Sequence, residues 1–389
     1  MLMRNTGVIS MGIKTPIIRE GDDLAKIVVN SVLNATLKDS KFIDVPDETT
    51  KSGWRVEEVK SYNINDKDVI GITESVVARS LGNYVTVDDI GLDLQLKFGS
   101  NVNYVIVNPI YSRNRFSMIL KAIARASNNL VVIYMPDADE VGNPSGVNQF
   151  TGVNMKEYYT ELVNKENRKC VIVEHSLGDN SEEEKQYTIP NAVYIYCGLH
   201  DYEQWKEDYG DDTHITLADI CKNRCDYGLL GSNKATEEKL KLFPTKQTSQ
   251  VLVEKVQQMI LDKTGKKVEV MVYGDGCFKD PVGGIWEFAD PVVSPAFTSG
   301  LVGTPNEIKI KAFADDKFSN LNGDELTSAL KNEIKLKDSN LVGNMAAEGT
   351  TPRRFTDLLG SLMDLTSGSG DKGTPVVLVQ HYFENYSMD

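Results

Sequence analysis

The sequence predicts an α+β fold that contains a small parallel-sheet α/β module. Four short apolar runs between residues 100 and 225 are continuous rather than alternating, which is typical of parallel strands buried on both faces. Two of them, Tyr104–Val107 and Leu130–Tyr134, flank a helical pattern within roughly 30 residues, the length of a βαβ unit. The other two are Cys170–Val173 and Val193–Tyr196. We therefore expect a module over about 100–225 that is inserted in, or added to, a different core.

Composition and charge argue against nucleic-acid and membrane partners. The 389 residues include 42 basic and 56 acidic side chains, which gives a net charge of −14 and no local basic stripe to bind a phosphate backbone. No run of about 18 apolar residues is present, and Met1–Lys14 lacks the apolar core of a signal peptide. We expect a soluble cytoplasmic protein that binds a small polar ligand.

The five cysteines are scattered along the chain, a pattern that fits reduced thiols in the cytoplasm. Cys221 and Cys225 are one helical turn apart and could share a metal ion. Since no second pair lies nearby in the sequence, buried structural thiols are the expected alternative.

Before the module, the pattern predicts one helix and one strand. Asp22 or Asp23 is the natural N-cap of a helix whose apolar residues keep helical spacing up to Ala35. The turn Asn65–Asp68 leads into a strand predicted over Val69–Val77. Both elements precede the module in the chain.

After the module, an amphipathic helix is predicted over Val251–Leu261. Thr248 or Ser249 would cap its start, and Gly265 would end it. A strand over Lys267–Tyr273 follows and runs into a glycine-flanked aspartate. Residues 283–303 are rich in glycine, proline and aromatic residues, so we expect ordered loop and short strands there.

The end of the chain is expected to form two helices and a final strand. The helices are predicted over Asp324–Leu336 and Arg353–Thr366. The second has Thr351 as its cap and Pro352 at its first position, where a missing N–H costs nothing. A strand over Pro375–Gln380 follows.

Two predicted helix starts place arginines where an anion could bind. At Ser112–Arg115 and Thr350–Arg354, backbone donors and the positive end of the helix dipole coincide with guanidinium groups. These groups belong to Arg113, Arg115, Arg353 and Arg354. The first pair could equally be surface arginines beside a cap. In an acidic protein, two such helix starts favour an anionic ligand.

Acidic residues follow several predicted strands. Asp137 and Asp139 come after Leu130–Tyr134, where open parallel sheets bind ligands, and could hold Mg²⁺ or Mn²⁺. A solvated acidic turn is the alternative. His175 and His200 follow two further strands and would lie on the same rim. Asp275, between two glycines, could let a metal approach closely, or could form a hairpin turn.

Segments on both sides of the module match one known pattern. Before it these are Pro16–Leu24, Asp66–Val77, Arg79 and Gly82, and after it Gly228–Asn233, Leu242–Pro244, Leu261–Asp275, Asp357–Leu365 and Gly373–Val379. The pattern resembles the coenzyme F420-0:L-glutamate ligase family, or gamma-glutamyl ligases, over roughly half of the chain. The resemblance implies a mixed-sheet, ligase-like core from residues 1–95 and 226–389, with 96–225 inserted as the module.

The family's activity, as the resemblance implies it, is GTP-dependent amide formation. GTP phosphorylates a carboxylate to an acyl phosphate, the amine of L-glutamate attacks, and GDP and phosphate leave. Mg²⁺ or Mn²⁺ would neutralise the phosphates. The resemblance also implies a homodimer, a small anionic substrate and a nucleotide as partners.

The same resemblance assigns roles to single residues. Asp275 would be the strongest metal ligand, Ser75 and Arg79 would lie near phosphates, and Ser232 and Asn233 would line the same site.

Where the family has a metal-binding aspartate, this chain has Leu230, and the nearest acid is Asp226. The family's arginine-rich stretch after the strand is Cys277–Lys279 here. A binding protein that kept the scaffold and lost the metal is therefore an alternative to an amide-forming ligase. A third interpretation is a hydrolase centred on the module, with Asp137, Asp139 and His175.

Overall fold

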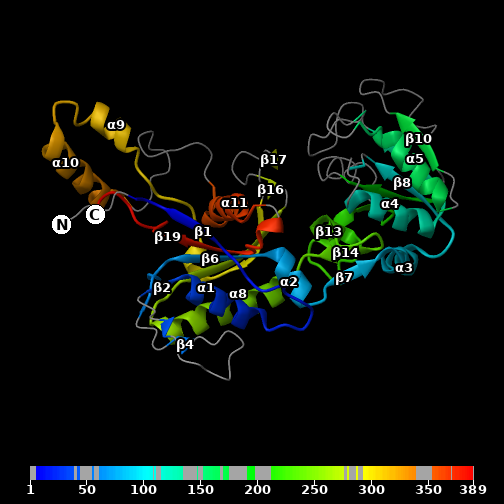
Figure 1. The fold of residues 1–389 in the computed structure, drawn as a ribbon. Coiled ribbons are helices and arrows are strands. Elements are labelled where there is room, and N and C mark those ends of the chain that lie inside the picture. Colours follow the sequence, from blue (N-terminus) through cyan, green and yellow to red (C-terminus); the bar gives the residue numbers. More distant parts are fainter. Residues whose placement is uncertain are drawn as a thin grey trace. The chain divides into compact units, whose positions relative to one another are not determined.

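The computed structural model folds into two compact units (Figure 1). It describes residues 6–38, 42–43, 55–56, 61–107, 109–110, 115–134, 147, 152–166, 170–174, 191–197, 212–275, 278–279, 286–287, 292–338, 353–368 and 370–388. Unit 1 comprises Met1–Val77 and Lys246–Asp389, and unit 2 comprises Ala78–Thr245. A mixed sheet in unit 1 and a parallel sheet in unit 2 confirm the predicted α+β class.

Unit 1 is built on a five-stranded mixed sheet. Its strands, in spatial order, are β1 (Ile9–Ile13), β19 (Val376–Gln380), β6 (Val69–Thr73), β15 (Glu269–Asp275) and β18 (Val292–Phe297). Only β6 and β15 are parallel neighbours; the other three pairs are antiparallel. The sheet therefore joins segments from both ends of the chain.

Helices cover both faces of this sheet (Figure 1). They are α1 (Leu24–Ala35) and α8 (Lys246–Thr264) on one face and α11 (Phe355–Ser367) on the other. Strand side chains alternate between the two cores, as the period of two requires: Ile70 and Ile72 pack against α1 and α8, and Val69 packs on the side of α11. Because both faces are covered, β6 and β19 are apolar throughout most of their length.

The remaining described elements of unit 1 are short strands and peripheral helices. They are β2 (Leu37–Lys38), β3 (Phe42–Ile43), β4 (Arg55–Val56), β5 (Ser61–Tyr62), β16 (Phe278–Lys279), β17 (Trp286–Glu287), η3 (Ser299–Leu301), α9 (Ile310–Asp315), α10 (Gly323–Leu336) and η4 (Gly370–Lys372). The strands pair as β2 with β5, β3 with β4 and β16 with β17. The short strands within 283–303 confirm the expectation for that segment.

The start of the predicted strand at Val69 is correct, but its predicted end at Val77 is wrong. β6 stops at Thr73, and α2 (Glu74–Ser80) begins at once. The ladder ends here because the Thr73 N–H donates to the carbonyl of Pro375, which as a proline has no N–H to return. The β-branched valines that follow therefore enter a helix.

Helix starts were predicted with mixed success. Asp23 caps α1 as expected, its carboxylate accepting from the Lys26 N–H at 3.3 Å, and Gly265 ends α8. However, α8 begins at Lys246, so Thr248 and Ser249 lie inside it and do not cap it. Its first turn is polar and exposed for the most part, so apolar spacing does not reveal it.

The start of α11 was also predicted too early. It begins at Phe355 with Arg354 as its N-cap, so Arg353 lies outside the helix. The predicted cap Thr351 and first residue Pro352 lie outside the described residues. An ion pair between Arg354 and Asp357 spans the first turn in place of a hydroxyl cap.

Unit 2 contains the predicted parallel sheet. Its strands, in spatial order, are β10 (Cys170–Glu174), β9 (Ser127–Tyr134), β8 (Val102–Val107), β11 (Ala192–Tyr196) and β12 (His214–Thr216), and all neighbours are parallel. Its helices are α3 (Val87–Phe98), α4 (Arg115–Ala126) and α5 (Met155–Lys165), with η1 (Leu217–Asp219) and η2 (Gly228–Gly231). The βαβ unit β8–α4–β9 confirms the prediction made from its apolar runs.

A three-stranded antiparallel sheet completes unit 2. Its strands, in spatial order, are β13 (Ser232–Lys234), β14 (Lys239–Leu242) and β7 (Tyr84–Thr86). Unit 2 thus contains residues 78–95 and 226–245 in addition to the predicted module. The predicted bounds at 96–225 stay a prediction.

Candidate functional site

One end of the sheet in unit 1 brings together two residues of the predicted site. β6 and β15 run parallel in register, with Thr73 opposite Tyr273. Ser75 follows β6 by two residues, and Asp275 closes β15. The carboxyl ends of parallel neighbours meet at the same edge of a sheet, so the chain at Ser75 and the chain at Asp275 lie close together.

The antiparallel strands complete this edge. β1 ends where β19 begins, with Ile13 opposite Val376, and Val376 is in turn opposite Ile72. The Thr15 N–H donates to the Gly373 carbonyl at 3.3 Å, which joins the loops beyond these strands. Val292, the first residue of β18, is opposite Asp275. The edge therefore gathers five chain segments, and we name it the carboxyl edge: the ends of β1, β6 and β15 and the starts of β18 and β19.

Glu74 is a residue at the carboxyl edge that the sequence analysis missed. It lies between Thr73 and Ser75 as the first residue of α2, and only 4% of it is exposed. Buried carboxylates are uncommon, and those near ligand sites often carry function. In the sequence, Glu74 is visible only as a single acid directly after an apolar strand. An acid in the first turn of an ordinary helix gives the same pattern, so the sequence alone does not mark Glu74 as a site residue.

Arg353 and Arg354 lie at the opposite end of the same sheet. Phe355 packs against Tyr382 and Phe383, which follow the end of β19, whereas the carboxyl edge lies at the start of β19. The five residues of β19 separate the two ends by roughly 16 Å. The structure therefore does not bring these arginines to Asp275.

The Arg354 guanidinium also has a protein partner. It donates to both carboxylate oxygens of Asp357, from Nε at 3.0 Å and from Nη2 at 3.1 Å. An anionic ligand would have to compete with this buried carboxylate. The predicted anion-binding role of Arg353 and Arg354 stays a prediction.

In unit 2, the structure brings Arg115 together with Ser232. Arg115 Nη1 donates to the carbonyl of Leu230 at 3.0 Å and to the carbonyl of Ser232 at 3.4 Å. The Ser232 side chain is fully buried, and its hydroxyl donates to the Leu229 carbonyl at 2.6 Å. These contacts fasten η2 and β13 to the first residue of α4. Asn233, half-buried in β13, pairs with Lys241.

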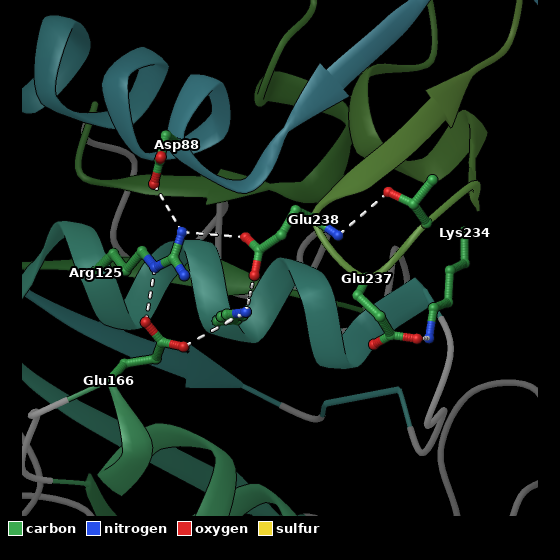
Figure 2. Close-up of polar contacts among 8 residues, drawn as sticks. Asp88, Arg125, Glu166, Lys234, Glu237 and Glu238 are labelled. Carbon is green, nitrogen blue, oxygen red and sulfur yellow. Dashed lines mark hydrogen bonds and ion pairs between the residues drawn. The ribbon is translucent and has the colours of Figure 1, made fainter.

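An ion-pair network holds α4 in this position (Figure 2). Arg125 donates to Glu166 at 2.7 Å, to Asp88 at 2.8 Å and to Glu238 at 3.3 Å, and Lys121 pairs with the same two glutamates. The hydrogen bond that Arg125 donates to Glu166 raises the pKa of Arg125 above its ordinary value. The network thus joins α3, α4, the end of α5 and the turn before β14.

The two cysteines considered as metal ligands are buried free thiols. Burial raises the pKa of the Cys221 thiol to about 12, so the thiol as it stands in the fold is protonated at neutral pH. Cys225 lies beside the Gly231 carbonyl. Their structural role is therefore the better interpretation.

The parallel sheet of unit 2 has a switch point between its first strand, β8, and β11. There the Cys197 N–H donates to the Val107 carbonyl at 3.1 Å, just beyond the strand ends. Such points are where open α/β sheets bind ligands. The residues predicted to follow these strands, Arg113, Asp137, Asp139, His175 and His200, lie outside the described residues.

Members of the predicted site belong to both units. Ser75 and Asp275 are in unit 1, whereas Arg79, Asp226, Ser232 and Asn233 are in unit 2. Arg79 and Asp226 are both exposed. Among the described residues, no group of three histidine, cysteine or acidic side chains gathers in a way that could hold a metal. A common pocket for all these residues stays a prediction.

The fold and the site define the class: a two-unit α+β protein with polar residues at the carboxyl edge of its mixed sheet. Such a scaffold is compatible with more than one kind of reaction. The sequence model of the F420-0:Gamma-glutamyl ligase family matches residues 12–381, nearly the whole chain. The chain therefore belongs to the F420-0:gamma-glutamyl ligase family, as the resemblance predicted. No curated protein matches it. Within the described ranges, every helix is too short or too polar to cross a membrane.

Proposed function

We propose that the chain forms a gamma-glutamyl amide bond between a small carboxylate and L-glutamate, with GTP as co-substrate and Mg²⁺ or Mn²⁺ as cofactor. The observation that carries the proposal is the family match over residues 12–381. Glu74, Ser75 and Asp275 at the carboxyl edge support it, because they place polar groups where the chain leaves two parallel strands.

A nucleotide is needed because a carboxylate does not react with an amine in water. To form an amide directly, the carboxylate would have to expel an oxide ion, which is a very poor leaving group. An acyl phosphate instead releases inorganic phosphate, which is a good leaving group. In the proposed reaction the γ-phosphoryl group moves from GTP to the carboxylate, the amine of L-glutamate displaces phosphate, and the amine gives up one proton. When bound, the divalent ion would neutralise charge on the phosphates.

The residues at the carboxyl edge have the donor chemistry for such an ion. Carboxylates of Glu74 and Asp275 are the oxygen ligands that Mg²⁺ and Mn²⁺ favour. The Ser75 hydroxyl, half-buried at the start of α2, is suited to a phosphate oxygen.

The alternative proposal is a protein that binds a nucleotide or small anion without catalysis. Leu230 favours it, since this residue occupies the position of a family metal ligand and its carbonyl is bound by Arg115. A hydrophobic side chain cannot ligate Mg²⁺, so this alternative predicts binding without turnover.

Melting temperatures with GTP or ATP, each with Mg²⁺ or Mn²⁺, test the proposal. Nucleotide at ten times its dissociation constant should add about 1.4 kcal/mol of stability. Mass spectrometry with L-glutamate and candidate acids should then detect an amide and GDP in equal amounts. Binding without any product supports the alternative, and a flat response to all four nucleotide–metal pairs contradicts both.

The variant Asp275→Asn should lose the metal-dependent part of this stabilisation while it keeps the melting temperature of the unliganded protein. Asp262→Asn is the matched control, because Asp262 is an acid on the solvent side of α8 whose partner is Gln258. Equal nucleotide responses in the two variants would show that Asp275 is not a ligand.

A further inference from the structure

A hollow of about 680 Å³ lies in unit 1 between the end of β1 and the second half of α1. Its lining comprises the continuous segment Gly12–Pro16 and five residues of α1, namely Ile27, Asn30, Ser31, Asn34 and Ala35. Nothing in the proposed reaction uses these helix residues. β1 is an edge strand, three positions from β15 in the sheet, so the hollow is roughly 14 Å from the strand that ends in Asp275.

The lining is cationic in a strongly acidic protein. Among the described residues that line it, Lys14 carries the only charge, and none is an aspartate or glutamate. Asn34 is a surface neighbour of both Asn30, at i and i+4, and Ser31, at i and i+3, so the three side chains line the hollow from adjoining positions of α1. The hollow therefore presents one ammonium group with two amides and a hydroxyl.

These donors are not used elsewhere in the part of the chain that the structure describes. The side chains of Lys14, Asn30, Ser31 and Asn34 form no hydrogen bond or ion pair there. The last carbonyls of α1 do not need Lys14 as a donor. The Thr36 hydroxyl donates to the Val32 carbonyl at 2.9 Å and to the Leu33 carbonyl at 3.3 Å. That capping also weakens the negative end of the α1 dipole, which would otherwise disfavour an anion.

Both walls of the hollow are held firmly. The opposite face of α1 is buried in the core through Val28, Val29 and Val32. The other wall is anchored where the Thr15 N–H donates to the Gly373 carbonyl. A ligand would therefore meet a backbone framework that is already in place, onto which the exposed side chains of Lys14, Asn30 and Asn34 can close.

We propose that this hollow is a binding site for a small monocarboxylate that carries an amide and no free ammonium group. One lysine balances one carboxylate, whereas a phosphate dianion would leave a charge uncompensated. The two asparagines can both donate to and accept from an amide. A free amino acid is disfavoured because the described lining residues offer no acid for its ammonium group.

N-acetylglycine is the probe, and glycine and inorganic phosphate are the comparison ligands. Titration of the full-length ¹⁵N-labelled protein, without nucleotide or metal, should shift the amide resonances of Lys14, Ser31 and Asn34 in a saturable way. Glycine and phosphate should bind at least about tenfold more weakly. The proposed ligation can fail without changing this result, since no reactant of that reaction is present.

Lys14→Met should weaken N-acetylglycine binding about tenfold, and Asn30→Asp should weaken it at least as much by placing a carboxylate of the same size in the lining. Lys26→Met is the matched control on an exposed position of α1 outside the lining, and should change the affinity less than about twofold. The proposal is overturned if N-acetylglycine causes no saturable shift, if phosphate or glycine binds equally well, or if Lys26→Met weakens binding as much as Lys14→Met. Unchanged amide resonances outside the hollow verify that each variant is folded.

Discussion

At the scale of single residues, close packing rather than chemical reactivity determines which residue type several positions can accept. Gly71 lies in the middle of β6, where α11 approaches the sheet. A Cβ there would overlap Met363 Sδ and come within 3.0 Å of Tyr273 Cε1. The Glu269 carboxylate is similarly enclosed: it accepts from Thr298 Oγ1 and from the Gly300 N–H. A sequence pattern does not reveal such contacts, because they depend on which helix covers which strand.

Gly71→Ala should therefore lower the free energy of unfolding by about 1–3 kcal/mol, since the core must shift to admit one methyl group. Gly91→Ala is the matched control in α3, where an added Cβ would lie 3.6 Å from the nearest atom, the Ala122 carbonyl oxygen. There the better helix propensity of alanine should raise stability by about 0.5–1 kcal/mol. Urea unfolding measures the free energy of unfolding of both variants. If the two substitutions change it in the same direction, the close packing at Gly71 is contradicted.

At the scale of elements, the sequence predicted interiors better than ends. The apolar runs of β8 and β9 and the spacing within α1 identify these elements because burial imposes their periods. The end of β6 at Thr73 depends on Pro375, which is about 300 residues away in the sequence and adjacent only in the folded sheet. The start of α8 is polar, so no apolar period marks it. Long-range pairing and polar turns account for both errors.

The position of α4 should depend on the network in Figure 2. Arg125→Met removes the bonds to Glu166, Asp88 and Glu238 and should cost about 1 kcal/mol, a modest value because 30% of the arginine side chain is exposed. Lys234→Met is the matched control, since its partner Glu237 is 86% exposed, and should cost less than about 0.5 kcal/mol. Thermal unfolding at low and high salt checks this, and a smaller cost for Arg125→Met than for Lys234→Met would contradict the proposed role of the network.

At the scale of the whole molecule, the family and the fold class could be predicted from segments at both chain ends. The chain at Ser75 lies near the chain at Asp275 because β6 and β15 are parallel neighbours, a pairing that no local pattern specified. The position of Arg354 could not be predicted either, since it depends on which end of the sheet α11 starts from. The same holds for the unit boundary: residues 226–245 pack with the module through Arg115 and Glu238, contacts that no local pattern encodes.

The boundary leads to a prediction about folding. Residues 78–245 expressed alone should fold cooperatively, because unit 2 has its own parallel sheet and buried core. Residues 96–225, the bounds predicted from the sequence, should be less stable by at least about 2 kcal/mol. The shorter fragment lacks the carbonyls that accept from Arg115 and the Glu238 carboxylate that binds Lys121 and Arg125. Urea unfolding followed by circular dichroism compares the two, and equal stability would show that residues 78–95 and 226–245 do not belong to the folding unit.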